Sequence, residues 1–381
     1  MKRFIIPISL SLTLLMHQNL HSSPIKNKIN SKGAVLIEQE SKRVLYEKNA
    51  QEILPMASTT KIMTCIVALE QGNLEDIVTV SQRAASAPAV KLSLRTNEKQ
   101  RLGDLLYSLM MESHNDTAVA IAEHIGGTVE NFCDMMTAKA KSIGAYQTSF
   151  KTPNGLDAKD HYTSAYDLAL IGAYALQNPE FVKIITTTNI NIPTQKMSGS
   201  RPHSLQNKNR FMYIYEGANG IKTGFTNKAG HCFVGAANKG GMQLIGVALA
   251  AGWGNQGKTQ KYRDVITLMD YGFKYYKKYD LVLPAKDYVR IPVKKGVAEQ
   301  LSLECNQKVT LPLSKEEQEN TYLKKVVPTF IEAPVQKGTI IGKVEVICEG
   351  NTLASANLEA QDDIKKATLI DYFRKWLKLK D

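Results

Sequence analysis

The sequence predicts an α/β fold, in which an antiparallel sheet is assembled from two distant parts of the chain and helices pack on it. Pairs of strand-like segments lie at residues 33–49 and 220–250, and the second pair contains a hairpin turned at Lys239-Gly240-Gly241. Between these pairs, apolar residues recur at helical spacing. This order favours a sheet built from both ends of the region, with flanking helices and a helical insert.

The individual elements follow from the same periodicities. Helices are expected between the strand pairs at 58–71, 104–112, 116–124, 129–143 and 165–176, and after them at 258–278. From about Leu281 the chain changes to short β-like runs, such as 289–293 and 342–348, separated by charged turns. These runs predict a small all-β domain that serves as a spacer or docking module.

The last segment, residues 363–380, has the pattern of an amphipathic helix. One face of its helical wheel carries Leu369, Ile370, Phe373, Trp376 and Leu377. The opposite side carries Arg374, Lys375 and Lys378. Aromatic residues on one face and basic residues on the other are typical of a helix that lies in the membrane interface. The alternative is a helix docked on the β-rich domain.

Composition limits the possible classes of protein. The chain has 381 residues, of which 43% are hydrophobic and 22% charged, so a largely disordered protein is excluded. The net charge of +12 suits a surface that meets anionic lipid or cell-wall polymer. Nucleic acid would suit it too, but the sequence contains no zinc-finger spacing, helix-turn-helix pattern or RNA-binding aromatic motif. We therefore expect no nucleic-acid partner.

The five cysteines do not indicate a metal site. They form no Cys-x-x-Cys pair, and the sequence contains no His-Glu-x-x-His motif, so a zinc site is not expected. Cys305 and Cys348 both lie in the β-rich region, where they would either form a disulfide after export or remain buried thiols.

The N-terminus has the pattern of a secretory signal peptide. Met1-Lys2-Arg3 is a basic start, and the apolar run at 4–16 is too short to span a bilayer stably. We expect residues 1–23 to be the signal peptide, with an uncleaved anchor as the alternative.

Three short motifs carry the chemistry: Ser58-Thr59-Thr60-Lys61, Ser113-His114-Asn115 and Lys222-Thr223-Gly224. Residues three apart on a helix share one face, so the lysine of the first motif lies within reach of its serine. A serine hydroxyl needs a neighbouring base, and a desolvated lysine can be that base. The second motif supplies a hydroxyl and an amide, and the third a cation and a hydroxyl suited to a carboxylate.

Each motif is weak when taken alone. A Ser-x-x-Lys match is expected by chance about once or twice in a chain of this size. Ser58 alone could be a helix N-cap, and Lys222-Thr223-Gly224 a strand running into a turn. Their order and context are what indicate a common site, because each motif lies at the edge of an expected helix or strand.

With these motifs, the chain closely resembles the low-molecular-mass penicillin-binding proteins that are serine-type D-alanyl-D-alanine carboxypeptidases. The resemblance is strong over about residues 32–280. Besides the three motifs it rests on 34–37, 44–50, Pro153-Asn154-Gly155-Leu156 and 164–169. It implies a β-lactamase/transpeptidase-like fold, no cofactor, a peptidoglycan stem peptide as substrate, and β-lactam antibiotics as covalent inhibitors.

The resemblance also implies a role for each site residue. Ser58 is the nucleophile, Lys61 its base and Ser113 a proton relay. Asn115, Lys222, Thr223 and Gly224 bind the substrate, and the backbone N–H groups of Ser58 and Phe225 form the oxyanion hole. His114 stands where the family usually has glycine or another small residue. It would either narrow the cleft or add a titrating group.

Two other functions remain alternatives at this point. A β-lactamase shares all three motifs, but the expected Glu-x-x-Leu-Asn is missing, and Glu180 is a poor substitute. A non-catalytic wall-binding morphology protein would not need the serine and both lysines. The expected organisation is a signal peptide (1–23), a carboxypeptidase domain (24–280), a small β-rich domain (281–360) and a membrane-anchor helix (361–381). We expect an exported protein, bound peripherally to the extracytoplasmic (periplasmic) face of the cytoplasmic membrane.

Overall fold

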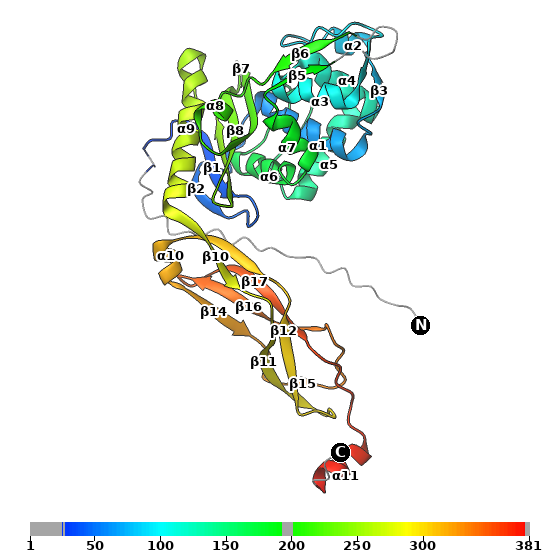
Figure 1. Cartoon of the computed structure of the whole chain (residues 1–381), viewed down its shortest axis with the longest axis vertical. Helices are drawn as coiled ribbons and strands as arrows, with labels where there is room; N and C mark the ends of the chain where they lie inside the picture. The colour runs from blue at the N-terminus through cyan, green and yellow to red at the C-terminus, as the bar shows by residue number, and fades with distance from the viewer. Residues whose placement is uncertain (1–24, 26, 193–200, 378–381) are drawn as a thin grey trace.

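The computed structural model describes residues 25, 27–192 and 201–377 (Figure 1). The expected signal peptide lies outside these residues. The N-terminal domain is built on a five-stranded antiparallel sheet with the strand order β2-β1-β9-β8-β7. These strands are β1 (Gly33–Glu38), β2 (Val44–Lys48), β7 (Ala218–Thr226), β8 (Gly230–Lys239) and β9 (Met242–Leu249). The first strand therefore pairs with the last, which confirms the predicted α/β fold class.

Both faces of the sheet are buried, each in a hydrophobic core of its own. Along β1, Val35 and Ile37 face one core, whereas Ala34 and Leu36 face the other, as the two-residue period of a strand requires. Helix α9 (Gly254–Tyr275) covers the second face (Figure 1). This double coverage explains why the central strands are almost wholly apolar.

The longer of the remaining helices of this domain lie on the face opposite α9 (Figure 1). They are α1 (Lys61–Gln71), α3 (Leu102–Met111), α4 (Asn115–Gly126), α5 (Val129–Ile143), α6 (Ala165–Ala175) and α7 (Pro179–Thr186). Shorter elements join them: η1 (Ala57–Thr60), α2 (Gln82–Ala85), α8 (Phe211–Ile214), and the strand pairs β3 (Ile77–Thr79) with β4 (Lys99–Arg101) and β5 (Asn189–Ile192) with β6 (His203–Gln206). Helix α1 contacts α3, α4, α5, α6 and α7, so it is the centre of this layer.

Beyond α9 the chain forms a β-rich domain with a third core. Its main sheet has the order β14-β16-β17-β12-β11-β15, and β10 pairs with β13 beside it. The strands are β10 (Tyr276–Val282), β11 (Ala285–Lys294), β12 (Gln300–Cys305), β13 (Val309–Ser314), β14 (Thr321–Val326), β15 (Ile331–Glu332), β16 (Ile340–Cys348) and β17 (Asn351–Ala360). All five cysteines are buried free thiols, so Cys305 and Cys348 form no disulfide.

Helix α9 ends earlier than its apolar spacing predicted. The expected helix ran from 258 to 278, but the backbone becomes extended at Tyr276 and continues as β10. Tyr276 pairs with Ser314 of β13, and its hydroxyl donates a hydrogen bond to the Leu45 carbonyl oxygen at 3.4 Å. The tyrosine is half-buried and packs at the junction between the two domains.

An arginine fixes this junction. Arg43, in the turn between β1 and β2, donates hydrogen bonds to the Pro312 carbonyl oxygen and to both carboxylate oxygens of Glu317. Only 10% of its side chain is exposed. Glu317 lies in α10 (Lys315–Glu319), where its carboxylate also completes the capping box with Ser314. This charged pair links the sheet of the N-terminal domain to the β-rich domain, together with the ion pairs of Lys278 on β10 with Glu38 and Glu40.

The chain ends in helix α11 (Leu369–Trp376), at the far end of the β-rich domain (Figure 1). Its apolar side chains are turned to solvent, and Leu369 and Trp376 are 88% and 76% exposed. Among the described residues, none of the helices combines the length and apolar character needed to cross a membrane.

Candidate active site

Ser58 lies in the single 3₁₀ turn η1, directly before α1. The sequence predicted that Ser58 begins the helix, but the α-helical hydrogen bonds start at Lys61. A 3₁₀ turn is common at a helix N-terminus. Strand β7 packs closely against this turn: a Cβ added to Gly224 would stand only 2.8 Å from the Ser58 backbone nitrogen. Glycine is therefore required at position 224 for steric reasons.

Lys61 is fully buried, and its ammonium connects the parts of the site. Its Nζ donates to the hydroxyl of Ser58 at 3.0 Å, to Oδ1 of Asn115 at 2.9 Å and to the carbonyl oxygen of Asn154 at 2.6 Å. Burial, followed by the positive charge of Lys222, holds the pKa of Lys61 well below its ordinary value. A lysine that loses its proton this readily can serve as a general base.

The loop around Asn154 contributes to the site through its backbone. Thr64 donates to the Pro153 carbonyl oxygen at 2.6 Å, which docks the loop on α1. Gly155 has a φ of +85° and lies so close to the chain that an added Cβ would stand 2.0 Å from the Ala57 carbonyl oxygen. The loop thus aims the Asn154 carbonyl group at the lysine. The sequence motif was noted, but this role was not predicted.

A buried histidine holds the end of the same loop. Nδ1 of His161 accepts a hydrogen bond from the Lys151 backbone N–H at 3.0 Å, so Nε2 carries the proton and donates to Oγ1 of Thr60, also at 3.0 Å. Burial lowers the pKa of His161 to about 4, and the ring stays neutral. Sequence analysis missed this residue, because nothing near it in the chain indicates its partner.

Ser113 and Asn115 lie where α3 passes into α4. Asn115 is held at both ends of its amide: Oδ1 accepts from Lys61, and Nδ2 donates to the carbonyl oxygens of Pro88 and Ala89 at 3.2 and 2.9 Å. Ser113 has a φ of +68°, and its buried hydroxyl has no hydrogen-bond partner among the described residues. The hydroxyl is therefore available to a ligand.

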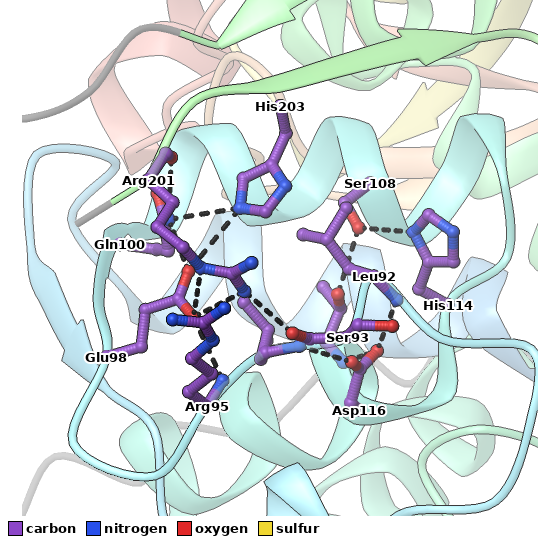
Figure 2. Close-up of polar contacts among 12 residues, drawn as sticks. Leu92, Ser93, Arg95, Glu98, Gln100, Ser108, His114, Asp116, Arg201 and His203 are labelled. Atoms are coloured by element: carbon purple, nitrogen blue, oxygen red, sulfur yellow. Dashed lines mark hydrogen bonds and ion pairs between the residues drawn. The ribbon is translucent and has the colours of Figure 1, made fainter. Parts of the chain in front are cut away.

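The loop beside Asn115 is fixed by two carboxylates (Figure 2). Asp116 accepts hydrogen bonds from the backbone N–H groups of Leu92 and Leu94, both at 3.0 Å. Glu98, which is 2% exposed, forms an ion pair with Arg201 at 2.8 Å. Arg201 also donates to the Ser93 carbonyl oxygen at 2.7 Å (Figure 2). These contacts hold the carbonyl groups that orient Asn115.

The His114 side chain is buried and contacts α3. Its ring is 4% exposed, and Nδ1 lies 2.8 Å from the Ser108 hydroxyl (Figure 2). Nε2 lies 3.4 Å from a carboxylate oxygen of Glu112. Burial lowers the pKa of His114. The histidine therefore packs between α3 and α4. It was expected either to narrow the cleft or to add a titrating group, and its buried position speaks against narrowing of the cleft.

Lys222 and Thr223 lie on β7, at the edge of the sheet. Lys222 is 3% exposed, and its Nζ donates to the Thr223 carbonyl oxygen at 3.2 Å. Burial, and then the positive charge of Lys261, lower the pKa of Lys222 to about 7. A cavity of about 110 Å³ separates Lys222 and Thr223 from Ser113. The structure thus gathers residues of all three motifs around Ser58 and this cavity.

Known proteins resemble this chain along most of its length. Residues 18–252 match the family model described as D-alanyl-D-alanine carboxypeptidase, and residues 274–366 match that of the penicillin-binding protein 5 C-terminal domain. The chain is 33% identical to the D-alanyl-D-alanine carboxypeptidase DacF of Bacillus subtilis over 360 residues, which cover 92% of this chain and 91% of the relative. It is 30% identical to DacA of Haemophilus influenzae over 367 residues, covering 92% and 90%.

A solved structure shows the same fold. Penicillin-binding protein 5 from Haemophilus influenzae superposes with a TM-score of 0.77 at 28% identity, covering 89% of this chain and 98% of that one. The chain therefore belongs to the D-alanyl-D-alanine carboxypeptidase family of serine hydrolases, among the low-molecular-mass penicillin-binding proteins.

Proposed function

We propose that Ser58 is the nucleophile with which this enzyme removes the terminal D-alanine from peptidoglycan stem pentapeptides. The observation that carries the proposal is the 3.0 Å contact between the Ser58 hydroxyl and the buried Nζ of Lys61. A neutral Lys61 accepts the hydroxyl proton as Oγ attacks the carbonyl carbon of the D-alanyl-D-alanine bond. The C–N bond then breaks, D-alanine leaves as the amine, and the acyl group stays on Ser58 until water hydrolyses the ester.

The other motif residues bind and orient the substrate. Lys222 and Thr223 receive the terminal carboxylate, which makes the enzyme an exopeptidase, and Asn115 holds the substrate amide. Ser113 passes a proton to the leaving amine. The backbone N–H groups of Ser58 and Phe225 bind the oxyanion, and Gly224 lets β7 come close enough to the nucleophile for this.

Labelling with penicillin tests the assignment. A β-lactam should acylate Ser58 by the same attack, and mass spectrometry of a proteolytic digest should find the adduct there. The Ser58→Ala variant should neither form the adduct nor release D-alanine from a pentapeptide that ends in D-Ala-D-Ala. An adduct on Ser113 would contradict the proposal.

The lifetime of the adduct separates the alternative functions. A carboxypeptidase keeps the penicilloyl group for a long time, whereas a β-lactamase turns it over quickly. A wall-binding protein without catalysis forms no adduct. Glu180, the candidate deacylation base of a β-lactamase, forms an ion pair with Lys183 in the first turn of α7. This position supports the carboxypeptidase.

We further propose that α11 binds the exported enzyme to an anionic membrane surface. Leu369, Ile370 and Trp376 are each at least 66% exposed, and such a face gains about 25 cal/mol per Å² of apolar area that leaves water. Removal of residues 363–381 should leave turnover of a soluble peptide nearly unchanged but abolish binding to anionic vesicles. Salt should weaken vesicle binding by the full-length mature protein. If the truncated protein still sediments with vesicles, α11 is not the anchor.

A further inference from the structure

The cavity between α3 and β7 contains a buried amide that the proposed mechanism does not use. Its volume is about 110 Å³, and Ser113, Lys222 and Thr223 line it together with Asn209. Asn209 lies in the segment between β6 and α8, outside the three motifs. It is 6% exposed. A buried amide of this kind normally has its hydrogen bonds satisfied.

Two buried polar atoms from this lining have no hydrogen-bond partner within the described part of the chain. They are Nδ2 of Asn209 and Oγ of Ser113. Lys222, beside them, donates a hydrogen bond to the Thr223 carbonyl oxygen, and burial lowers its pKa to about 7. An amide donor, a hydroxyl and an ammonium therefore surround one small cavity, and such a set complements an anionic oxygen ligand.

The orientation of the Asn209 amide is fixed by its neighbours. Oδ1 accepts a hydrogen bond from the Phe211 backbone N–H at 3.2 Å, which leaves the amino group as the free end. The Asn209 backbone N–H donates to Oδ1 of Asn207 at 3.0 Å. Asn207 in turn donates through Nδ2 to the carbonyl oxygens of Ile185 and Thr187 at 2.9 and 3.0 Å. The donor is thus held in place before any ligand arrives.

The one carboxylate in the lining, that of Glu112, already has partners of its own. An oxygen of Glu112 lies 3.6 Å from Nζ of Lys208 and accepts a hydrogen bond from the Gln206 backbone N–H at 2.8 Å. Its other oxygen faces His114 at 3.4 Å. Glu112 therefore accepts no hydrogen bond from Asn209 or Ser113 and leaves these donors to a ligand.

We propose that Asn209 is a further substrate-binding residue, whose Nδ2–H donates to an oxygen of the substrate's terminal carboxylate while Lys222 supplies the positive charge. The inference rests on the proposed carboxypeptidase function and deepens it. At about 110 Å³ the cavity has room for several water molecules, so a carboxylate fits in their place. Asn209 then discriminates between substrates with a free carboxylate and those in which it is blocked.

Two acylating probes test this role: penicillin G, which has a free carboxylate, and its methyl ester. In Asn209→Asp the Phe211 N–H keeps its acceptor, but a carboxylate replaces the donor. Acylation by penicillin G should slow by about 10- to 100-fold, the usual effect of losing a hydrogen bond to a charged group. Acylation by the ester should change by less than about threefold, since an ester oxygen accepts only weakly from the amide. Asn209→Ala should give the same pattern with a smaller loss.

The controls separate the possible outcomes. Asn219→Asp makes the same exchange on β7 at the Gln243 contact, away from the cavity, and should leave both rates unchanged. Equal losses with both probes, or no loss with either, in Asn209→Ala and Asn209→Asp would mean that Asn209 only binds water or supports the fold. A wild-type enzyme that does not distinguish penicillin G from its ester would instead contradict the carboxylate subsite of the proposed function.

Discussion

Substrate binding should load a proton onto Lys222. The pKa of this lysine is lowered to about 7, mainly by burial and then by Lys261, so at pH 8 only about one-tenth of the free enzyme carries the ammonium. A bound carboxylate favours the charged form and raises the pKa again. Binding at pH 8 should therefore take up about 0.9 proton. The affinity for the substrate should therefore be greatest below pH 7 and fall by about tenfold per pH unit as the pH rises above 7.

Calorimetry on an inactive variant measures this uptake directly. Ser58→Ala binds a D-Ala-D-Ala pentapeptide without cleaving it, and its binding enthalpy in two buffers with different ionisation enthalpies gives the number of protons. Lys222→Arg in the same background is the matched control. Arginine stays charged, so its uptake should be close to zero and its affinity flat from pH 6 to 9. Equal uptake in both variants would place the titrating group elsewhere, and no uptake in either would refute the reasoning.

Three further predictions follow from the geometry. Lys61→Arg should slow penicillin acylation by about 100- to 10,000-fold at every pH, because arginine cannot act as the base; recovery at high pH would contradict this. Gly224→Ala places a Cβ 2.8 Å from the Ser58 backbone nitrogen, so β7 must shift. The free energy of unfolding, measured by thermal denaturation, should fall by about 1–3 kcal/mol, and the rate of acylation, measured by stopped flow, by about 100-fold. An unchanged acylation rate would exclude a tight oxyanion hole. Arg43→Ala leaves Glu317 without the cation of this ion pair and should lower the free energy of unfolding by about 1–3 kcal/mol. Small-angle X-ray scattering should show a broader range of interdomain distances. An unchanged scattering profile would show that the junction does not depend on this pair.

The sequence was sufficient for those parts of the site that depend on local spacing. Ser58 and Lys61 are three residues apart on one helical face, and their side chains meet at 3.0 Å. The apolar runs of β1, β8 and β9 were likewise readable, because strands buried on both faces are nearly continuous in apolar residues.

Contacts made by the backbone or across long distances could not be predicted. The carbonyl group of Asn154 accepts from Lys61, but every residue type has a carbonyl group, so no side chain identifies it. Asn209 reaches the cavity only because the segment after β6 is anchored to α7. The end of α9 was misplaced for a similar reason: Tyr276 pairs with Ser314 and donates a hydrogen bond to the Leu45 carbonyl oxygen, and these residues lie 38 and 231 positions away in the sequence.

The pairing of β1 with β9 determines when the enzyme can first work. Ala34 lies opposite Ala248, so the middle of the sheet is completed by the last strand of the N-terminal domain to be synthesised. A chain that emerges N-terminus first leaves one hydrogen-bonding edge of β1 unpaired until β9 is available, and one of its apolar faces uncovered until α9 follows. Ser58 lies in η1, the next element after β2 in sequence, and it acquires its neighbouring strand β7 only shortly before that moment. Assembly is therefore governed by loop closure across more than half of the chain, and a partly translated or partly exported chain has no hydrolytic activity.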